Sequence, residues 1–182
     1  IDLAGPQFQQ VTLPAGLTSF GYHTGVTVGD IDEDGFPDLY VTAYGRSSLW
    51  HNNGDGTFED VGVSTKTAVD SWSTSAAFVD LNGDGFLDLY VVGYVDASDD
   101  PPRICREPAS PTGTKQCSPT LFPAIDDFCL INNGTGAFTD ITRDAGITGL
   151  DGKGLGVVAC DVNGDRRPDL FVANDGTPCF LY

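Results

Sequence analysis

Residues 30–40 read DIDEDGFPDLY, and the same phrase returns as DLNGDGFLDLY at residues 80–90 and as DVNGDRRPDLF at residues 161–171. Each copy places a carboxylate or a carboxamide at positions 1, 3, 5 and 9 of a loop that runs into an apolar segment. Ca²⁺ takes about six to eight oxygen ligands, and alternate side chains of a tight loop, with a main-chain carbonyl at position 7, can surround it. The phrase therefore predicts three calcium loops, each leading into a β-strand.

The predicted ligands are four side chains and one carbonyl in each loop. They are Asp30, Asp32, Asp34, Asp38 and the Phe36 carbonyl in the first loop, Asp80, Asn82, Asp84, Asp88 and the Phe86 carbonyl in the second, and Asp161, Asn163, Asp165, Asp169 and the Arg167 carbonyl in the third. Gly35 and Gly85 occupy position 6, where a sharp turn favours a residue without Cβ. Arg166 replaces this glycine in the third loop. We expect that loop to bind Ca²⁺ most weakly.

Asx turns, an EF-hand and a Mg²⁺ site are alternatives to calcium loops. Asx-rich turns, in which the side chains only accept main-chain N–H groups, would also use Asp and Asn. An EF-hand would need Glu at position 12, where Val41, Val91 and Val172 stand. Mg²⁺ prefers to keep its waters and seldom uses an all-protein cage. Three copies in register favour Ca²⁺ in a structural role that holds each turn together.

The charge of the chain also favours metal binding by the acidic loops. Its 182 residues include 26 acidic and 9 basic ones, for a net charge of −17, which excludes a nucleic-acid binder. The acid is concentrated in the loops, where the twelve side-chain positions hold ten Asp and two Asn. Such carboxylates repel one another at close range. We therefore expect the fold to depend on the metal.

The loops also reveal a longer repeat. Strand-like segments led by Phe8, Phe58 and Phe138 are each followed by a small-residue strand, the acidic loop, a second apolar strand and, in two copies, an Asn-Asn-Gly turn. The predicted units of this single repeat region, 1–182, are residues 8–57, 58–137 with an insertion at 96–126, and 138–182, which stops mid-unit. Four short antiparallel strands in about 50 residues are typical of a β-propeller blade. We predict an all-β fold of about three blades, as a partial propeller or an open array.

The motif GVxVGDxDxDGxxDLYVxxYGxxxLxxNNGDGTFxDV resembles the FG-GAP/VCBS repeat of integrin-α-like β-propellers, and most closely the secreted cartilage-acidic-protein/UnbV-type group. The resemblance covers nearly the whole chain outside the insertion. It implies propeller blades and an extracellular protein used in adhesion or matrix interaction. Propellers of this family have about seven blades, whereas this chain holds about three.

The insertion is rich in Pro, Ser and Thr and contains Cys105 and Cys117. A disulfide between them would order a segment with few hydrophobic residues, whereas zinc would need two further ligands that the spacing does not offer. Cys129, Cys160 and Cys179 remain, as thiols or in other pairs. Asn133 begins an Asn-Gly-Thr glycosylation sequon in a turn that favours Asn-Gly in any case.

The remaining candidate functional residues, and the compartment in which the protein works, are less clearly indicated by the sequence. His23 and His51 have no ligand spacing and are interpreted as surface or packing residues, while Trp50 and Trp72 are expected to pack between blades or to stack on a sugar. No segment is apolar enough to span a membrane. The cysteines and the calcium loops favour an oxidising exterior: secreted, cell-surface or, in a bacterium, periplasmic.

Three functions fit these features. The first is a non-catalytic, calcium-stabilised extracellular module that binds a protein or a glycan. The second is a structural subunit whose open blades self-associate into an assembly or fibre. The third is part of a polysaccharide-processing enzyme, which would need a pair of carboxylates. The acids outside the loops that could serve it are Asp96, Asp99, Asp100, Asp126 and Asp127.

Overall fold

The computed structural model describes residues 7–18, 20–98 and 101–182, and it is built almost entirely from short antiparallel strands. Asp99 and Asp100 lie outside the described residues. The elements are β1 (Tyr22–Gly29), β2 (Asp38–Arg46), β3 (Ser48–Asn52), β4 (Phe58–Asp60), α1 (Gly62–Thr65), β5 (Asp70–Val79), β6 (Asp88–Gly93), β7 (Cys105–Arg106), β8 (Thr114–Lys115), the 3₁₀ turn η1 (Pro119–Leu121), β9 (Phe128–Asn132), β10 (Phe138–Asp140), β11 (Gly154–Cys160), β12 (Asp169–Asn174) and β13 (Phe180–Leu181).

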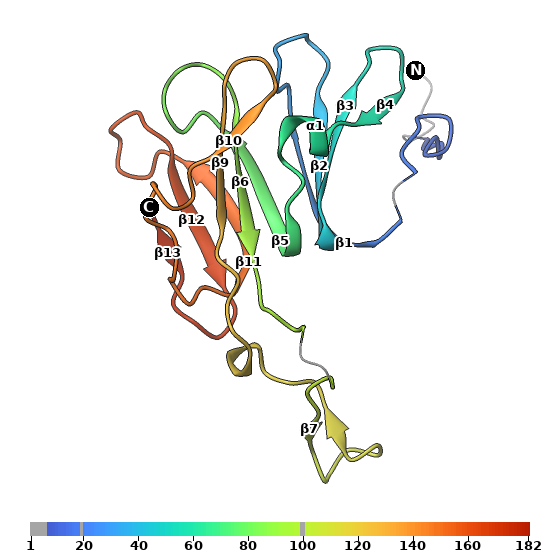
Figure 1. Cartoon of the computed structure of the whole chain (residues 1–182), viewed down its shortest axis with the longest axis vertical. Helices are drawn as coiled ribbons and strands as arrows, with labels where there is room; N and C mark the ends of the chain where they lie inside the picture. The colour runs from blue at the N-terminus through green and yellow to red at the C-terminus, as the bar shows by residue number, and fades with distance from the viewer. Residues whose placement is uncertain (1–6, 19, 99–100) are drawn as a thin grey trace, which may run out of the picture.

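These strands form three blades that stand side by side like part of a propeller (Figure 1). The first blade is β1–β2–β3–β4, the second is β5–β6–β9–β10, and the third is β11–β12–β13. A short pairing between the end of β2 and the start of β5 joins the first two blades into one sheet. The prediction of an all-β fold built as a partial propeller is confirmed.

The boundaries of the sequence repeat and of the blade differ by one strand, because the second and third repeats begin with the last strand of the preceding blade. The segment led by Phe58 contributes β4, which pairs with β3 of the preceding blade. The predicted strand beyond β4 was wrong, because Gly62–Thr65 forms the helical turn α1. Asp60 Oδ1 accepts the N–H of Gly62 at 3.0 Å, and the Thr65 N–H and hydroxyl both bond to the Val61 carbonyl. These local hydrogen bonds compete with strand pairing.

The first Phe-led strand was also predicted wrongly. Residues 8–17 contain turns and no strand, and the Phe8 side chain is 95% exposed. The Ala15 carbonyl nevertheless accepts the N–H of Phe58 at 2.8 Å. Apolar residues at this position are therefore not enough to form a strand without a paired neighbour.

The central strand of the second blade explains how the blades pack. All six residues of β6 are buried. Leu89 and Val91 join the core shared with the first blade, whereas Tyr90 and Val92 join the core shared with the third. Both faces of β6 are covered, so its sequence is continuously apolar rather than alternating.

The innermost strands are linked by a repeated hydrogen bond. The Thr24 hydroxyl in β1 donates to the Ser73 carbonyl in β5 at 2.5 Å, and the Thr74 hydroxyl in β5 donates to the Gly154 carbonyl in β11 at 2.7 Å. The two threonines stand 50 residues apart, which is the repeat length. Leu155 occupies the corresponding place in β11 and is exposed. Each bond fixes one blade against the next.

The outer faces of the first and third blades carry exposed apolar side chains. In β1, Val26 and Val28 are 63% and 58% exposed. In the third blade, Leu155, Val158 and Phe171 are also exposed. These strands have the apolar composition of β5 and β6 but lack a described blade against one face.

The insertion leaves after β6, returns before β9 and projects away from the blades (Figure 1). The predicted disulfide is present between Cys105 and Cys117, and it closes a small hairpin of β7 and β8. The other three cysteines are free thiols in the structure: Cys129 is buried between blades, and Cys160 and Cys179 are exposed. Burial raises the pKa of the Cys129 thiol to about 11, so it is protonated and unreactive at neutral pH.

One acid considered for catalysis, Asp127, is buried in the stem of this insertion. Its carboxylate accepts the Tyr90 hydroxyl at 2.7 Å and the Gly93 N–H at 2.9 Å. Burial raises the pKa of Asp127, and the two hydrogen bonds only partly oppose this. The residue therefore ties the stem to β6 at the cost of a desolvated charge.

We expect Asp127→Asn to change how stability depends on pH. The folded state holds the Asp127 proton more tightly than the unfolded chain does, so the contribution of this group to the free energy of unfolding falls as pH rises above its ordinary pKa of 3.8. An asparagine can accept from Gly93 and donate to the Tyr90 oxygen without that charge. In urea unfolding at a series of pH values, the variant should gain stability relative to the wild type as pH rises. Asp126→Asn, at an exposed neighbour, is the control, and parallel pH profiles for wild type and Asp127→Asn would contradict the assignment.

Candidate functional site

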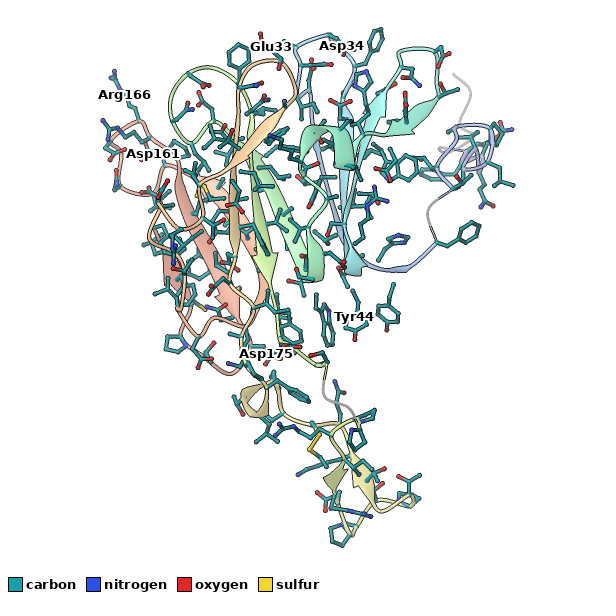
Figure 2. All side chains as sticks on the ribbon, in the orientation of Figure 1. Glu33, Asp34, Tyr44, Asp161, Arg166 and Asp175 are labelled. Carbon is teal, nitrogen blue, oxygen red and sulfur yellow. A yellow bond between two sulfur atoms is a disulfide. The ribbon has the colours of Figure 1, made fainter. Side chains whose placement is uncertain are left out.

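The three acidic loops connect the two inner strands of each blade and lie at the same end of the molecule (Figure 2). The first joins β1 to β2, the second β5 to β6 and the third β11 to β12. The insertion lies at the opposite end. The sequence prediction that each loop joins two strands of one blade is confirmed.

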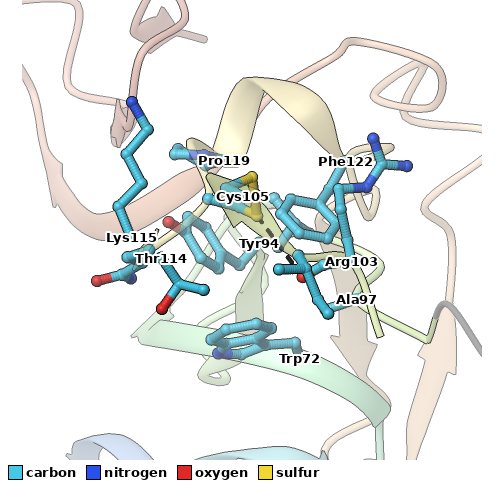
Figure 3. A pocket seen from close by; sticks show the side chains of 13 residues that line it. Trp72, Tyr94, Ala97, Arg103, Cys105, Thr114, Lys115, Pro119 and Phe122 are labelled. Atoms are coloured by element: carbon cyan, nitrogen blue, oxygen red, sulfur yellow. Dashed lines mark hydrogen bonds between the residues drawn. A yellow bond between two sulfur atoms is a disulfide. The ribbon is translucent and has the colours of Figure 1, made fainter. Parts of the chain in front are cut away.

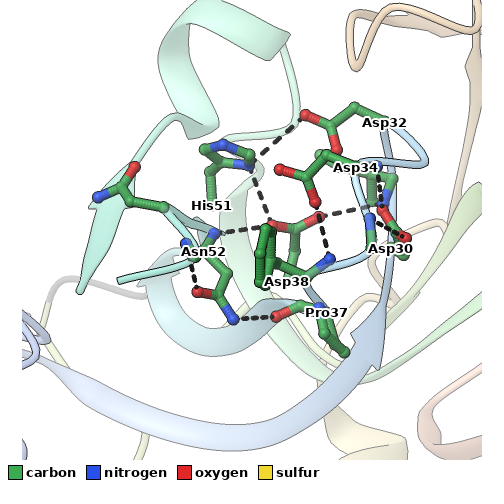
Figure 4. A network of polar contacts seen from close by, with 12 residues as sticks. Asp30, Asp32, Asp34, Pro37, Asp38, His51 and Asn52 are labelled. Carbon is green, nitrogen blue, oxygen red and sulfur yellow. Dashed lines mark hydrogen bonds and ion pairs between the residues drawn. The ribbon is translucent and has the colours of Figure 1, made fainter. Parts of the chain in front are cut away.

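The first loop brings its acids closest together (Figure 4). Carboxylate oxygens of Asp30, Asp32 and Asp34 lie within 4.8 Å of one another. Two oxygens bound to the same Ca²⁺ at about 2.4 Å can be at most about 5 Å apart. These three carboxylates are therefore spaced so that one cation could touch all three, and oxygen donors suit Ca²⁺ better than a softer metal.

A histidine that the sequence interpretation treated as a surface or packing residue lies beside this cluster. His51 Nδ1 is 3.1 Å from Asp38 Oδ1 and 3.7 Å from Asp32 Oδ2. These three side chains form a second group whose ligand atoms lie within 4.8 Å. His51 lies beside the loop because β2 pairs with β3. The linear spacing between Asp38 and His51 gives no indication of this proximity.

The hydrogen bonds inside the loops follow one scheme. The carboxylate at position 1 accepts the N–H groups of positions 5 and 6, as Asp30 does at 3.1 and 2.9 Å and Asp80 at 3.2 and 3.0 Å. Asp161 does the same, and both Asp80 and Asp161 also accept the N–H of the glycine at position 4, Gly83 and Gly164. The Arg166 N–H is the main cause that lowers the pKa of Asp161. Asx turns and a metal site are therefore compatible in these loops, since the turns orient the carboxylates.

The aspartate at position 9 has a different environment. Asp38 and Asp88 are both 0% exposed. Asp88 accepts the N–H of Leu81 and the N–H of Asn132, each at 2.9 Å, and Asp38 makes the equivalent pair of bonds. Burial raises the pKa of both carboxyl groups. The aspartate at position 9 therefore links the start of the loop to the third strand of the blade through these two hydrogen bonds. In the third copy, Asp169 accepts from Val162 at 2.8 Å and from the Asn163 amide.

The residue at position 7 packs its side chain on the next turn of the blade. A Cβ on Gly54 would come within 2.6 Å of the Phe36 ring, and one on Gly134 within 2.7 Å of the Phe86 ring. The Asn-Asn-Gly turns therefore require glycine for this close approach. Arg167 stands in this position in the third loop, so the aromatic contact is not repeated there.

Position 6 of the loop requires a left-handed backbone. Its φ is +91° at Gly35 and +95° at Gly85, and Arg166 adopts +70° in the third loop. A side chain in this region costs about 1 kcal/mol or more relative to glycine. The expected weakness of the third loop therefore has a specific cause in its backbone, to which the two arginine charges beside the carboxylates add.

We expect Arg166→Gly to stabilise the protein by about 1 kcal/mol, because it removes the left-handed strain. It should also tighten Ca²⁺ binding at the third loop. Chemical denaturation and calcium titration of the variant measure the two effects. Arg167→Gly is the matched control, because it removes the same charge without a left-handed φ at that position. Equal effects of both substitutions would assign the weakness to charge alone.

Asn133, the sequon asparagine, is exposed in the β9–β10 turn. Its Oδ1 accepts the Thr135 N–H and hydroxyl at 3.0 and 2.7 Å. Asp126 accepts the N–H of Gly149, and Asp96 the N–H of Ser98. Asp96 thus stabilises a local turn, whereas Asp126 links the end of the insertion to the segment before β11.

Fold and loops together define a propeller-type protein built from repeats with an acidic loop in each blade. The family model for the FG-GAP-like repeat matches residues 30–91 and 126–172, which is more than half of the chain. The chain belongs to the FG-GAP-like repeat family. The stretch between the two matches corresponds closely to the insertion, and the matched segments contain all three acidic loops. The comparison with curated proteins gives no match.

Proposed function

We propose that this chain is an extracellular, calcium-stabilised FG-GAP repeat module that binds a protein or a glycan and carries out no catalysis. The supporting observation is the acidic cluster of the first loop, with its hydrogen-bond scheme repeated in the other two. FG-GAP repeats commonly bind calcium. The disulfide favours an oxidising compartment. In the part of the chain that the structure describes, no helix is long and apolar enough to cross a membrane.

The metal part of this proposal is tested by calorimetric titration of the metal-free chain with Ca²⁺. About three binding events are expected, the tightest at the first loop, which carries the most carboxylates. Asp32→Ala should remove the event assigned to the first loop, because that side chain belongs to the acidic cluster. It accepts no main-chain hydrogen bond from the part of the chain that the structure describes, so its removal should leave the blade folded. Asp55→Ala, in the neighbouring turn, is the control. Titration heats identical to those of buffer would refute calcium binding.

The second part of the proposal is that the chain binds a protein or a glycan. Exposed loops on a rigid scaffold are suited to binding other molecules. Array binding with immobilised glycans and with matrix proteins, in Ca²⁺ and in EGTA, would separate the two partner classes. Turnover of a polysaccharide by the purified chain would instead support the enzyme alternative, in which this chain is part of a carbohydrate-processing propeller.

A structural subunit is the second candidate, and the exposed faces of the first and third blades favour it. Val26 and Val28 on one side and Leu155 and Val158 on the other would be covered if copies stacked blade to blade. Size-exclusion chromatography over a concentration series would show growing assemblies. A monomer at all concentrations would exclude this candidate.

We also propose the narrower relationship and the modification suggested by the sequence. The chain is assigned to the cartilage-acidic-protein/UnbV-type group on the form of its repeat motif, and Asn133 is assigned as a glycan acceptor because it is exposed in a turn. Expression in a secretory eukaryotic host, followed by glycosidase treatment, tests the second assignment. A mass unchanged by the enzyme would refute it.

A further inference from the structure

An imidazole lies beside the carboxylates of the first acidic loop, and one of its nitrogens faces them (Figure 4). His51 Nδ1 is 3.1 Å from Asp38 Oδ1 and 3.7 Å from Asp32 Oδ2. Each of these three side chains offers one ligand atom within 4.8 Å of the other two. The corresponding residue of the second blade is Ile131. Two loops with the same repeat motif therefore have different donor atoms beside them.

The separations between these donors suit a metal ion smaller than Ca²⁺. Zn²⁺ binds nitrogen and carboxylate oxygen at about 2.0–2.2 Å, so its neighbouring ligand atoms are about 3.0–3.5 Å apart. The 3.1 Å between His51 Nδ1 and Asp38 Oδ1 falls in this range. The 3.7 Å between His51 Nδ1 and Asp32 Oδ2 is slightly longer, and the Asp32 side chain, which is 32% exposed, has room to adjust.

Two of the three donors are held in place by the fold. Asp38 is 0% exposed, and its Oδ2 accepts the Ile31 N–H at 3.0 Å while its Oδ1 accepts the Asn52 N–H at 2.8 Å. A carboxylate oxygen has a second lone pair, so Oδ1 can keep the bond from Asn52 and bind an ion on the side of His51. His51 belongs to β3 and pairs with Glu59 of β4. Donors fixed in this way lose little further entropy when a ligand binds.

The chemistry of the donors favours a transition metal. Imidazole suits Zn²⁺ and its neighbours in the first transition row, whereas Ca²⁺ takes oxygen ligands. One imidazole and two carboxylates fill three positions of a tetrahedral Zn²⁺ and leave the fourth for water. The two carboxylates also balance the charge of the ion. A neutral imidazole that binds through Nδ1 carries its proton on Nε2.

We propose that the first loop is selective for a divalent transition metal and binds Zn²⁺ through His51, Asp38 and Asp32. The second loop, with Ile131 in place of the histidine, lacks this selectivity. Asp32 also belongs to the acidic cluster assigned to Ca²⁺, so Zn²⁺ should displace Ca²⁺ from the first loop. The displacement rests on the proposed calcium function, whereas zinc binding itself does not.

Cysteine thiolates are the other ligands that could take Zn²⁺ in this chain. Cys105 and Cys117 are joined in the disulfide that lies beside the cavity beneath the insertion (Figure 3), so neither offers a thiolate. Burial raises the pKa of the Cys129 thiol to about 11, which disfavours its thiolate. Cys160 and Cys179 are exposed thiols, and the protein for the test therefore carries serine at both positions.

The test is titration of this disulfide-bonded protein with Co²⁺ in buffer that contains excess Ca²⁺. Co²⁺ replaces Zn²⁺ in such sites and has visible absorption bands that report its ligands. We expect saturation at one Co²⁺ per chain and loss of the bands on addition of one equivalent of Zn²⁺. The chain has two histidines, so long-range ¹H–¹⁵N spectra can follow each of them. Zn²⁺ should shift Nδ1 of His51 and leave His23 unchanged.

Calorimetric titration separates this proposal from the calcium function. Ca²⁺ titrated into the Zn²⁺-loaded chain should give one binding event fewer than it gives in the Zn²⁺-free chain. A chain that binds no Ca²⁺ but gives the Co²⁺ bands would remove the calcium proposal and leave the zinc site. A chain that binds Ca²⁺ but gives no Co²⁺ bands would do the reverse.

Substitutions of His51 assign the nitrogen donor. His51→Ile gives the first loop the residue of the second, which a folded blade accommodates at Ile131, and should weaken Zn²⁺ about a hundredfold or more. His51→Gln keeps a hydrogen-bond donor for Asp38 without an imidazole and should weaken Zn²⁺ equally. His23→Gln is the control and should have no effect. The proposal is overturned if Zn²⁺ does not shift His51 Nδ1, or if His51→Gln binds Zn²⁺ as tightly as the parent protein. Circular dichroism of each variant confirms that the blades remain folded.

Discussion

Chelation of Ca²⁺ with EGTA should lower the melting temperature of this protein by about 20 °C. A ligand at one hundred times its dissociation constant stabilises the folded state by about 2.7 kcal/mol per site. Three such sites would contribute about 8 kcal/mol, comparable to the whole stability of an ordinary domain. The effect is large because the metal-free loops also hold like charges: the oxygens of Asp30, Asp32 and Asp34 lie within 4.8 Å of one another.

The measurement is thermal unfolding by circular dichroism with and without the chelator. EGTA saturated with Ca²⁺ beforehand is the control for effects of the chelator itself. Addition of excess Ca²⁺ should restore the melting temperature, whereas Mg²⁺ should restore it only in part, because it retains its waters. A melting temperature unaffected by EGTA would leave the loops as Asx turns and remove the central part of the proposed function.

Much of this fold could be predicted from the sequence because its information is local and repeated. The acidic loop, the apolar strand after it and the Asn-Asn-Gly turn recur in register, and each encodes its own geometry through turn residues and β-branched or aromatic composition. The insertion was located for the same reason, since it interrupts a repeat whose length was known. The disulfide followed because Cys105 and Cys117 are the cysteines of one segment that cannot form its own core.

The errors concern features that depend on neighbours. Phe8 and Phe58 begin similar segments, but Phe58 is paired with β3 and Phe8 has no described strand beside it. His51 reaches the first loop only because β2 and β3 pair in a particular register. The stacked rings of Tyr44, Trp72 and Tyr94 join the first blade to the second, and no linear pattern places these three residues together. Tertiary pairing decides these features, and a single sequence does not encode it in any local motif.

The position-9 aspartates show how one residue type can have two roles within the same loop. Asp84 points into the loop, where its Oδ1 accepts the Phe86 N–H at 2.9 Å and its Oδ2 the Asn82 amide. Asp88 lies beneath the loop, and each of its oxygens accepts a main-chain N–H from a different segment. An asparagine at position 88 would turn its NH₂ group toward one of those N–H groups and leave a buried donor unsatisfied.

We therefore expect Asp88→Asn to lower the free energy of unfolding by about 3 kcal/mol. This is a large effect for a substitution that replaces one carboxylate oxygen with an NH₂ group. The loss is limited because burial already raises the pKa of Asp88, so the substitution also removes a desolvated charge. Urea unfolding in saturating Ca²⁺ gives the value. Asp84→Asn is the matched control: it removes the same charge from the same loop, keeps an acceptor for the Phe86 N–H and loses only the exposed bond from the Asn82 amide. It should therefore weaken Ca²⁺ binding with a smaller loss of stability.

Amide hydrogen exchange separates the effect of the Asp88 hydrogen bonds from that of the proposed metal binding. If position 9 fastens the loop to the third strand, Asp88→Asn should accelerate exchange at the N–H groups of Leu81 and Asn132, whether or not Ca²⁺ is bound. Asp84→Asn should leave both protected. Equal losses of stability in the two variants, with unchanged exchange at Leu81 and Asn132, would mean that Asp88 acts through the cation alone. The expected difference follows from burial: at 0% exposure, water cannot replace the missing acceptor.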